Sequence, residues 1–125
     1  MTTILTPAAP QPIGPYSQAI REGDLLFCSG QIPLDPKTGA MKNSSIEEEA
    51  EQSLINLREV LRAGSSDLSG VIKTTIFLTD MNDFAKVNEV YAKAFGDAKP
   101  ARSTVAVSAL PKGARVEIEC IARVL

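Results

Sequence analysis

Apolar residues recur at spacings of three and four in one long stretch near the middle of the chain, which predicts an amphipathic helix. The residues on its apolar face are Ile46, Ala50, Leu54, Leu57 and Leu61. Ser45 with Glu48 fits a capping box at the start of this helix, and Gly64 is expected to end it. The pair one position earlier, Ser44 with Glu47, gives the alternative register for the cap.

The same period returns over residues 81–95 and predicts a second helix. Its apolar face holds Phe84, Val87, Tyr91 and Phe95. Gly96 follows the last of these residues and is expected to end the helix. Asn88 lies inside the helix although Asn has a poor helix propensity. Its side chain either hydrogen-bonds a loop or faces water, and the pattern does not decide between the two.

Five segments are predicted to be β-strands. Residues 16–20 and 25–32 flank a glycine-containing turn and so predict a hairpin. Residues 70–80 are apolar and rich in β-branched side chains, which indicates a central strand. The remaining two strands begin at Arg102 and Arg115.

The last of these strands alternates most clearly between apolar and charged side chains. One set of positions holds Val116, Ile118, Cys120, Ala122 and Val124. The other set holds Arg115, Glu117, Glu119, Ile121 and Arg123. Because successive residues of a strand point to opposite sides, the first set should face a core. Ile121 in the second set indicates that the charged side is not fully exposed to water.

The order of elements, β-β-α-β-α-β-β, predicts an α+β fold with two layers, a mixed sheet with both helices on one face. Residues 1–125 are expected to form a single domain. The Pro- and Thr-rich residues 1–15 predict an extended segment, of which residues 1–12 form an N-terminal arm.

Charge and composition exclude several classes of function. The formal net charge is −2 and no Lys/Arg cluster is present, so nucleic acid is a poor candidate partner. The chain has no His, which excludes Ser-His-Asp triads, Cys-His pairs and His metal ligands. No metal-binding spacing and no glycine-rich phosphate loop is present. Cys28 and Cys120 are far apart in the sequence and are expected to be small buried hydrophobic residues.

No apolar stretch is long enough to cross a bilayer. The first ten residues have neither the basic start nor the apolar run of a signal peptide. We therefore expect a protein of the cytoplasm, or of an organelle matrix after processing.

A few residues are candidates for chemistry. Arg102 stands at the entrance of a strand, where its guanidinium could bind a ligand carboxylate or form an ordinary ion pair. Glu117 would be solvated in a monomer, but in an oligomer that covers its face it could orient a water molecule. Ser29 and Gly30 interrupt a strand, which allows either the close approach of a ligand or a β-bulge. Tyr16 follows a rigid Gly-Pro pair that would aim its ring.

Five segments, taken in order, resemble one known family. They are "IGPYSQAI", "CSGQIPLDPKTG", "VIKTTIFLTDMNDFAKVNEVY", "PARS" and "LPKGARVEIECIA". Together they resemble the RidA/YjgF family of reactive intermediate deaminases, whose members have also been labelled endoribonucleases or translation inhibitors. The resemblance runs from about Ile13 to the end of the chain.

The resemblance implies a chorismate-mutase-like α+β fold and a homotrimer whose sheets form a central barrel, with three clefts between subunits. It implies the hydrolytic deamination of 2-imino acids, such as 2-iminopropanoate and 2-iminobutanoate, to 2-oxo acids and ammonia. It also implies that neither a cofactor nor a metal is needed. Two alternatives stay open, a non-catalytic protein that binds small carboxylates and an endoribonuclease.

The resemblance also implies roles for particular residues. Arg102 matches the arginine that binds the substrate carboxylate, and Glu117 matches the carboxylate that positions the attacking water. The positions that match substrate-binding residues are Tyr16, Ser29, Gly30, Asn88 and Thr104. Thr104 stands where the family often has Cys, so a thiol cannot be essential here. Lys99 stands where an aromatic residue is frequent, which could change access to the cleft or the preferred substrate size.

Overall fold

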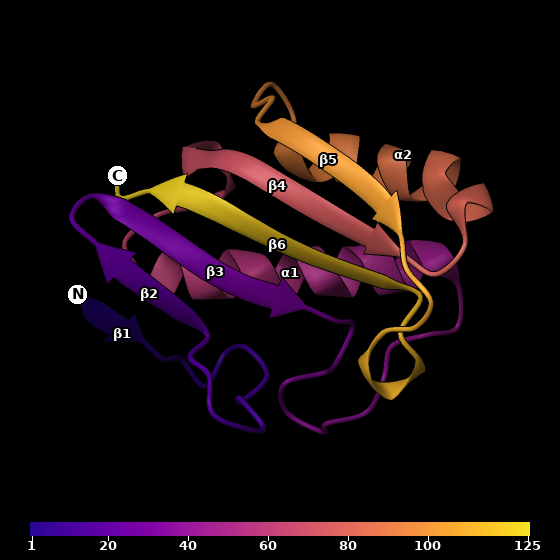
Figure 1. Ribbon diagram of the computed structural model, residues 1–125, viewed down its shortest axis with the longest axis horizontal. Helices are drawn as coiled ribbons and strands as arrows, with labels where there is room; N and C mark the ends of the chain where they lie inside the picture. Colours follow the sequence, from indigo (N-terminus) through magenta and orange to yellow (C-terminus); the bar gives the residue numbers. More distant parts are fainter.

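The computed structural model describes all 125 residues and shows two layers, a six-stranded mixed sheet and two α-helices behind it (Figure 1). The strands are β1 (Thr2–Ile4), β2 (Ala19–Glu22), β3 (Leu25–Gln31), β4 (Val71–Leu78), β5 (Ala101–Ala106) and β6 (Val116–Arg123). The helices are α1 (Ile46–Ala63) and α2 (Phe84–Phe95), with short 3₁₀ turns at Leu68–Gly70, Met81–Asp83 and Pro111–Gly113. The predicted α+β class with both helices on one face is confirmed.

The strands lie in the order β1-β2-β3-β6-β4-β5. Only β4 and β5 pair in parallel, and every other pair is antiparallel. The last strand of the chain, β6, therefore inserts between β3 and β4 and completes the middle of the sheet. As its apolar composition predicts, β4 has a neighbour on each side. The parallel strand β5 forms one edge of the sheet (Figure 1).

Helix α1 begins and ends where its sequence pattern predicts. The hydroxyl of Ser45 accepts a hydrogen bond from the amide of Glu48 at 3.0 Å, which selects the Ser45–Glu48 register. The carboxylate of Glu48 accepts in turn from the amide and the hydroxyl of Ser44. These bonds hold the pKa of Glu48 below its ordinary value, with the backbone bond as the largest cause. Gly64 directly follows the helix.

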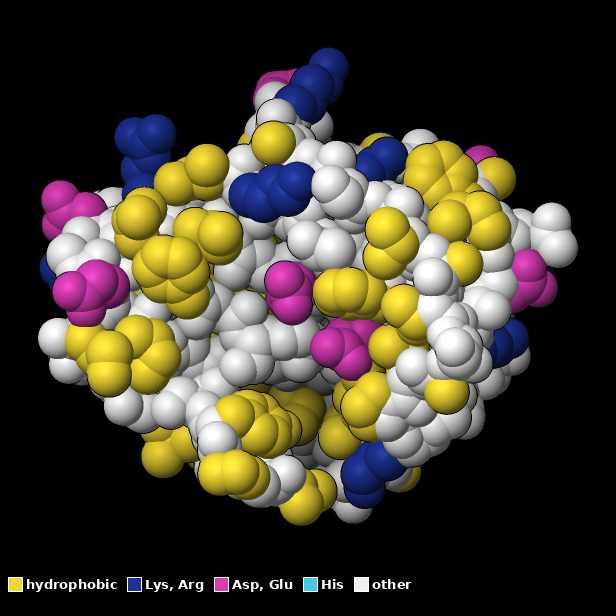
Figure 2. Space-filling model, viewed as in Figure 1, with side chains coloured by type: hydrophobic (Ala, Val, Ile, Leu, Met, Phe, Trp, Pro, Cys, Tyr) yellow, Lys and Arg dark blue, Asp and Glu magenta, His cyan; other side chains and the backbone are white.

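The alternation of β6 is confirmed and defines two distinct faces of the sheet. The side chains at Val116, Ile118, Cys120 and Ala122 are buried under the helices. The residues between them, which include Glu117 and Glu119, point to the opposite side, here named the open face. In one chain the open face has no covering layer (Figure 2). The positions of Glu117 and Glu119 near its middle set the geometry of the candidate site.

Cys28 and Cys120 are both buried and free, as predicted. They lie opposite one another on β3 and β6, on the side of the helices. Burial and the neighbouring Cys28 thiol raise the pKa of Cys120, with the hydrogen bond to Cys28 as the largest cause. Cys120 therefore stays protonated, and both side chains pack as part of the core.

The N-terminal arm contains a strand that the sequence pattern did not predict. The three residues of β1 pair with β2 and extend the edge of the sheet, with Thr3 opposite Ile20. A strand this short carries too few residues for an alternation to be visible. The predicted start of the next strand at residue 16 is wrong, because Tyr16 donates its amide to the Gly14 carbonyl in a turn and β2 begins only at Ala19.

Candidate active site

Glu117 lies beside an interruption in β3 that makes room for its side chain. The pairing of β3 with β6 shifts register between Cys28 and Gln31, so Ser29 and Gly30 form the irregular stretch expected from the sequence. A Cβ atom at Gly30 would overlap the carboxylate of Glu117. The absence of a side chain at Gly30 therefore lets the carboxylate fold down against the backbone of β3.

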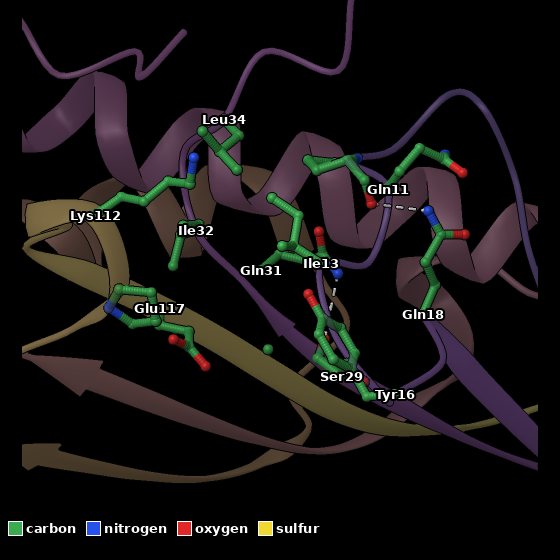
Figure 3. Close-up of a pocket in the computed structure, with 13 residues that line it drawn as sticks. Gln11, Ile13, Tyr16, Gln18, Ser29, Gln31, Ile32, Leu34, Lys112 and Glu117 are labelled. Atoms are coloured by element: carbon green, nitrogen blue, oxygen red, sulfur yellow. Dashed lines mark hydrogen bonds between the residues drawn. The ribbon is translucent and has the colours of Figure 1, made fainter. Parts of the chain in front are cut away.

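A cavity of about 490 Å³ opens in front of this carboxylate (Figure 3). Four predicted site residues line it, namely Tyr16, Ser29, Gly30 and Glu117. The other lining residues include Gln11 from the N-terminal arm, Ile13 directly after it, Ile32 and Leu34 from the segment after β3, and Lys112. The cavity thus has an acidic group on one wall and a mixture of polar and apolar side chains around it.

The surroundings of Glu117 favour the neutral form of its carboxyl group. Burial raises the pKa of Glu117, and the negative charge of Glu119 raises it further. The positively charged side chain of Lys112 lines the same cavity. A carboxylate with a raised pKa holds a proton more readily than an exposed one, so it is a stronger base toward water and can later return the proton.

Arg102 lies in a different setting, against helix α2. Its Nη1 donates to the Oδ1 atom of Asn88 at 2.7 Å. Its guanidinium carbon stands 4.9 Å from the ring centroid of Tyr91 and 5.5 Å from that of Phe84. The groups that contact the Arg102 guanidinium are thus uncharged, one carboxamide and two aromatic rings. Asn88 therefore bonds a strand side chain, which is neither the loop hydrogen bond nor the free, water-facing side chain considered from the sequence.

None of the six ion pairs in the chain includes Arg102. The ordinary ion pair considered as an alternative is therefore not formed within the chain. The side chain lines a second cavity, of about 370 Å³, together with Asn88, Tyr91, Lys99 and others. The guanidinium has five donors in a planar fork, so donors remain for an anion beyond the bond to Asn88.

Thr104 stands two residues after Arg102 on β5, on the same side of the strand. Its hydroxyl oxygen is buried and has no hydrogen-bond partner. Buried hydroxyls are satisfied in most structures, so an orphaned one beside a free guanidinium marks a polar position that a ligand or a second chain could satisfy.

The structure does not bring the two groups of predicted residues together within one chain. Arg102 pairs with Thr74 of β4, whose hydroxyl bonds the Tyr91 hydroxyl of α2, so Arg102 faces the helices. Glu117 pairs with Phe77, which lies on the open face. Paired residues of neighbouring strands point to the same side of a sheet. Arg102 and Glu117 therefore lie on opposite sides.

The open face carries more exposed apolar surface than a solvated sheet would need. Phe27 is 44% exposed and Val105 is 42% exposed, and Leu25 and Ile72 are also exposed. Figure 2 shows hydrophobic side chains spread over this side, with acidic side chains near its centre. An apolar surface of this kind is typical of an interface between protein chains.

Sequence reasoning missed several residues of the two cavities. Lys112 sits in the 3₁₀ turn before β6 with a left-handed backbone, φ 56°, which only a few per cent of residues other than Gly adopt. It lies in the segment "LPKGARVEIECIA" quoted for the resemblance, so that segment was the available signal. Gln11 and Tyr91 had no such signal, because an arm residue and a helix residue give no pattern that points into a cavity.

No group of three or more His, Cys, Asp or Glu residues lies close enough together to hold a metal ion. Neither helix combines the length and the apolar composition that a membrane span requires. The groups available for chemistry are therefore the carboxylate of Glu117, the guanidinium of Arg102, hydroxyls and carboxamides.

Comparisons with known proteins give the family. The model of the family described as Endoribonuclease L-PSP matches residues 6–124. A RutC family protein of Pyrococcus horikoshii is 56% identical over 119 residues, which is 95% of this chain and 94% of that protein. A Mus musculus protein named 2-iminobutanoate/2-iminopropanoate deaminase is 50% identical over 119 residues, 95% of this chain and 88% of that protein. The solved structure of E. coli TdcF with bound serine has a TM-score of 0.94 at 41% identity and covers 98% of each chain. This chain therefore belongs to the Endoribonuclease L-PSP family, which is the RidA/YjgF family that its motifs resemble.

Proposed function

We propose that the protein is an imine deaminase that hydrolyses small 2-imino acids, such as 2-iminopropanoate and 2-iminobutanoate, to 2-oxo acids and ammonia. Arg102 binds the substrate carboxylate and Glu117 activates the attacking water. Tyr16, Ser29, Gly30, Asn88 and Thr104 shape and orient the site. The homologue named as an imine deaminase and the related structure with bound serine support a substrate of this size and charge.

One observation carries the proposal, the setting of Glu117. Its carboxyl group is partly buried in a cavity and has a raised pKa, and the chain has no His that could act as a base instead. Glu117 is thus the group in this cavity best suited to accept a proton and return it.

The chemistry needs no further group. The carbon of a protonated imine is electrophilic, so a water molecule can attack it when a base takes one of its protons. Glu117 takes this proton, and the C–O bond forms as the C=N double bond becomes single. Glu117 then gives the proton to the amine nitrogen of the tetrahedral intermediate. The C–N bond breaks and ammonia leaves, the hydroxyl passes its proton through Glu117 to the ammonia, and the products are the 2-oxo acid and ammonium with Glu117 ionised again.

Arg102 supplies the second half of the site from another copy of the chain. Its paired donors match a carboxylate, and a carboxylate fixed at both oxygens places the adjacent imine carbon in one position. Because Arg102 and Glu117 lie on opposite sides of the sheet, a substrate that contacts both must lie between two chains. We therefore propose a homotrimer in which the open faces form the interior and each site is shared by two subunits.

A coupled assay tests the proposed function. An amino-acid oxidase generates 2-iminopropanoate in the presence of semicarbazide, which traps the imine as a semicarbazone that absorbs in the ultraviolet. The wild-type protein is expected to lower the rate of trapping, and Arg102→Ala is expected to lose this effect. Arg62→Ala is the matched control, because Arg62 pairs with Glu59 and Asp67 at the end of α1 and lines neither cavity.

Two other outcomes would favour other functions. Stabilisation of the protein by 2-oxobutanoate without any loss of imine would indicate a small-carboxylate-binding protein. RNA cleavage that persists through purification and disappears in Arg102→Ala would indicate an endoribonuclease, against the net charge of −2. If Arg102→Ala and wild type lower the rate of imine trapping equally, the role proposed for Arg102 is wrong.

A further inference from the structure

We infer that two buried carboxamides, Gln18 and Asn56, are positioning residues that hold the two irregular walls of the Glu117 cavity in place. This inference rests on the proposed function, because it assigns the two walls to substrate binding. Neither residue needs to contact the reacting atoms. Each one holds the backbone of a segment whose side chains line the cavity, and the side chain of Gln18 also lines the cavity itself.

Gln18 holds the N-terminal arm in place through side-chain hydrogen bonds. Its side chain is 1% exposed, and its Oε1 accepts from the amide of Thr6 at 2.7 Å. Its Nε2 donates to the carbonyl of Thr6 at 3.1 Å and to that of Pro10 at 2.9 Å, with a longer contact to Ala9 at 3.4 Å. One side chain thus bonds both ends of the five-residue stretch from Thr6 to Pro10. Figure 3 shows Gln18 with one of these bonds.

The fastened stretch leads directly into the cavity wall. Gln11 and Ile13 follow Pro10 and line the cavity opposite Glu117 and Lys112 (Figure 3). Between residue 5 and residue 18 the chain has no helix or strand, so no ladder of backbone bonds fixes this wall. The Gln11 side chain also bonds back to the arm, at the carbonyls of Thr6 and Ala9. Gln18 is the only buried side chain that ties the arm to the sheet in this way.

Asn56 fastens the opposite wall from helix α1. Its side chain is 0% exposed, and its Nδ2 donates to the carbonyls of Ile32 and Leu34, at 3.1 and 2.8 Å. Its Oδ1 accepts from Nε2 of Gln52 at 2.8 Å, which fixes which way the amide is turned. The side chains of Ile32 and Leu34 line the cavity. Both donors of the amide are therefore used to hold the segment after β3.

The chemistry of the carboxamide explains why other residues would fail at these positions. A carboxamide has two donor hydrogens and an acceptor oxygen, whereas a carboxylate of the same shape has no donor. Glu at position 18 or Asp at position 56 would face backbone carbonyls with a negative charge. An apolar side chain would leave those carbonyls without their partners, which is costly in a buried place. Only an amide both fits the space and bonds the walls.

The expected consequence is a change in substrate binding with little change in the chemical step. The walls contact the substrate, while Glu117 on β6 and Arg102 on β5 keep their places in the sheet. We expect Gln18→Glu and Asn56→Asp each to raise KM about tenfold and to change kcat by less than about threefold. If either variant fails to fold, Gln18→Met and Asn56→Leu keep the volume without adding a charge and take its place.

Hydrogen exchange gives a second readout that does not depend on turnover. In Gln18→Glu the hydrogen-bonded amides of Thr6 and Ala8 should exchange faster than in wild type. In Asn56→Asp those of Leu34 and Asp35 should do so. Each variant should leave the other wall unchanged. Ser66→Ala is the matched control, because Ser66 is also buried and bonds the Arg123 carbonyl at 2.6 Å, far from the cavity lining. This control should lose stability and keep the wild-type KM.

The outcomes separate the two proposals. If wild type does not hydrolyse imino acids, the proposed function fails, and exchange alone still reports whether each carboxamide holds its wall. If wild type is active but the two variants keep its KM and its exchange rates, the inference is wrong. If they lower kcat as strongly as they raise KM, the residues support the fold in general and the inference is equally wrong.

Discussion

The two faces of the sheet differ in how much of their apolar surface a single chain buries. On the helix side, Ile76 and Ile118 are fully buried beneath α1 and α2. On the open face, Phe27 and Val105 keep more than a third of their surface exposed, and Glu117 lies among them with a raised pKa. The helix side is a core buried within one chain, and the open face has the composition of a surface that another chain covers.

The predicted site residues follow the same division. Glu117, Tyr16, Ser29 and Gly30 gather on one cavity, and Arg102 with Asn88 gathers on another. Each cavity has half of the groups that the proposed reaction needs. The comparison teaches that one chain completes the fold, whereas the groups assigned to the proposed reaction lie in two separate cavities of that chain.

The largest expected effect on stability comes from the helix side. Leu57 of α1 is 0% exposed, so Leu57→Ala should lower the free energy of unfolding by about 2–5 kcal/mol at every protein concentration. Phe27→Ala on the open face should lower stability mainly by weakening self-association. Its effect on the free energy of unfolding should therefore be larger at low protein concentration. Urea unfolding at two protein concentrations measures both effects. An equal, concentration-independent loss in Phe27→Ala would contradict the idea that the open face is an interface.

A second prediction concerns the rate and sharpens the contrast between the two faces. Glu117→Gln keeps the shape of the side chain and removes the base, so imine hydrolysis should fall about 10²–10⁴-fold. In wild type, the rate should decline as the pH falls through the raised pKa of Glu117, because the protonated carboxyl group cannot accept a proton from water. A pH profile of kcat/KM measures this decline.

The same variant should be slightly more stable than wild type. A raised pKa means that the folded protein binds this proton more tightly than the unfolded chain does, so the ionised carboxylate opposes folding. The penalty is complete above the folded-state pKa and disappears as the pH falls below the unfolded value, near 4.5. The difference in Tm between Glu117→Gln and wild type should therefore be positive at pH 7 and shrink at pH 4. A lower Tm for the variant at pH 7 would contradict this account.

Much of the fold followed from local patterns, because its longer elements carry enough turns or alternations to be read. The face of α1, its Ser45 cap and the two faces of β6 were all predicted correctly. The strand β1 was not, since three residues in a Pro-rich arm show no period. The start of β2 was placed too early, because a turn at Gly14 interrupts a segment of suitable composition.

The site was only partly accessible from the sequence. The bulge at Ser29 and Gly30 was visible as a glycine in a strand, and Arg102 was visible as a charge at a strand entrance. The positioning bonds of Gln18 and Asn56 were not, because each joins residues that are distant in the sequence and meet only in the folded chain. For the same reason the opposite orientation of Arg102 and Glu117 depends on strand pairing, which no local pattern specifies.

Mixing two inactive variants tests the shared site most directly. Arg102→Ala and Glu117→Gln are each expected to be inactive alone. Unfolded together in equal amounts and refolded as mixed trimers, they should recover activity at about a quarter of the sites, because each site takes Arg102 from one chain and Glu117 from another. Two controls, each variant refolded alone, should stay inactive. If the mixture is as inactive as its components while wild type recovers fully from the same treatment, the two residues do not act together across chains and the account is wrong.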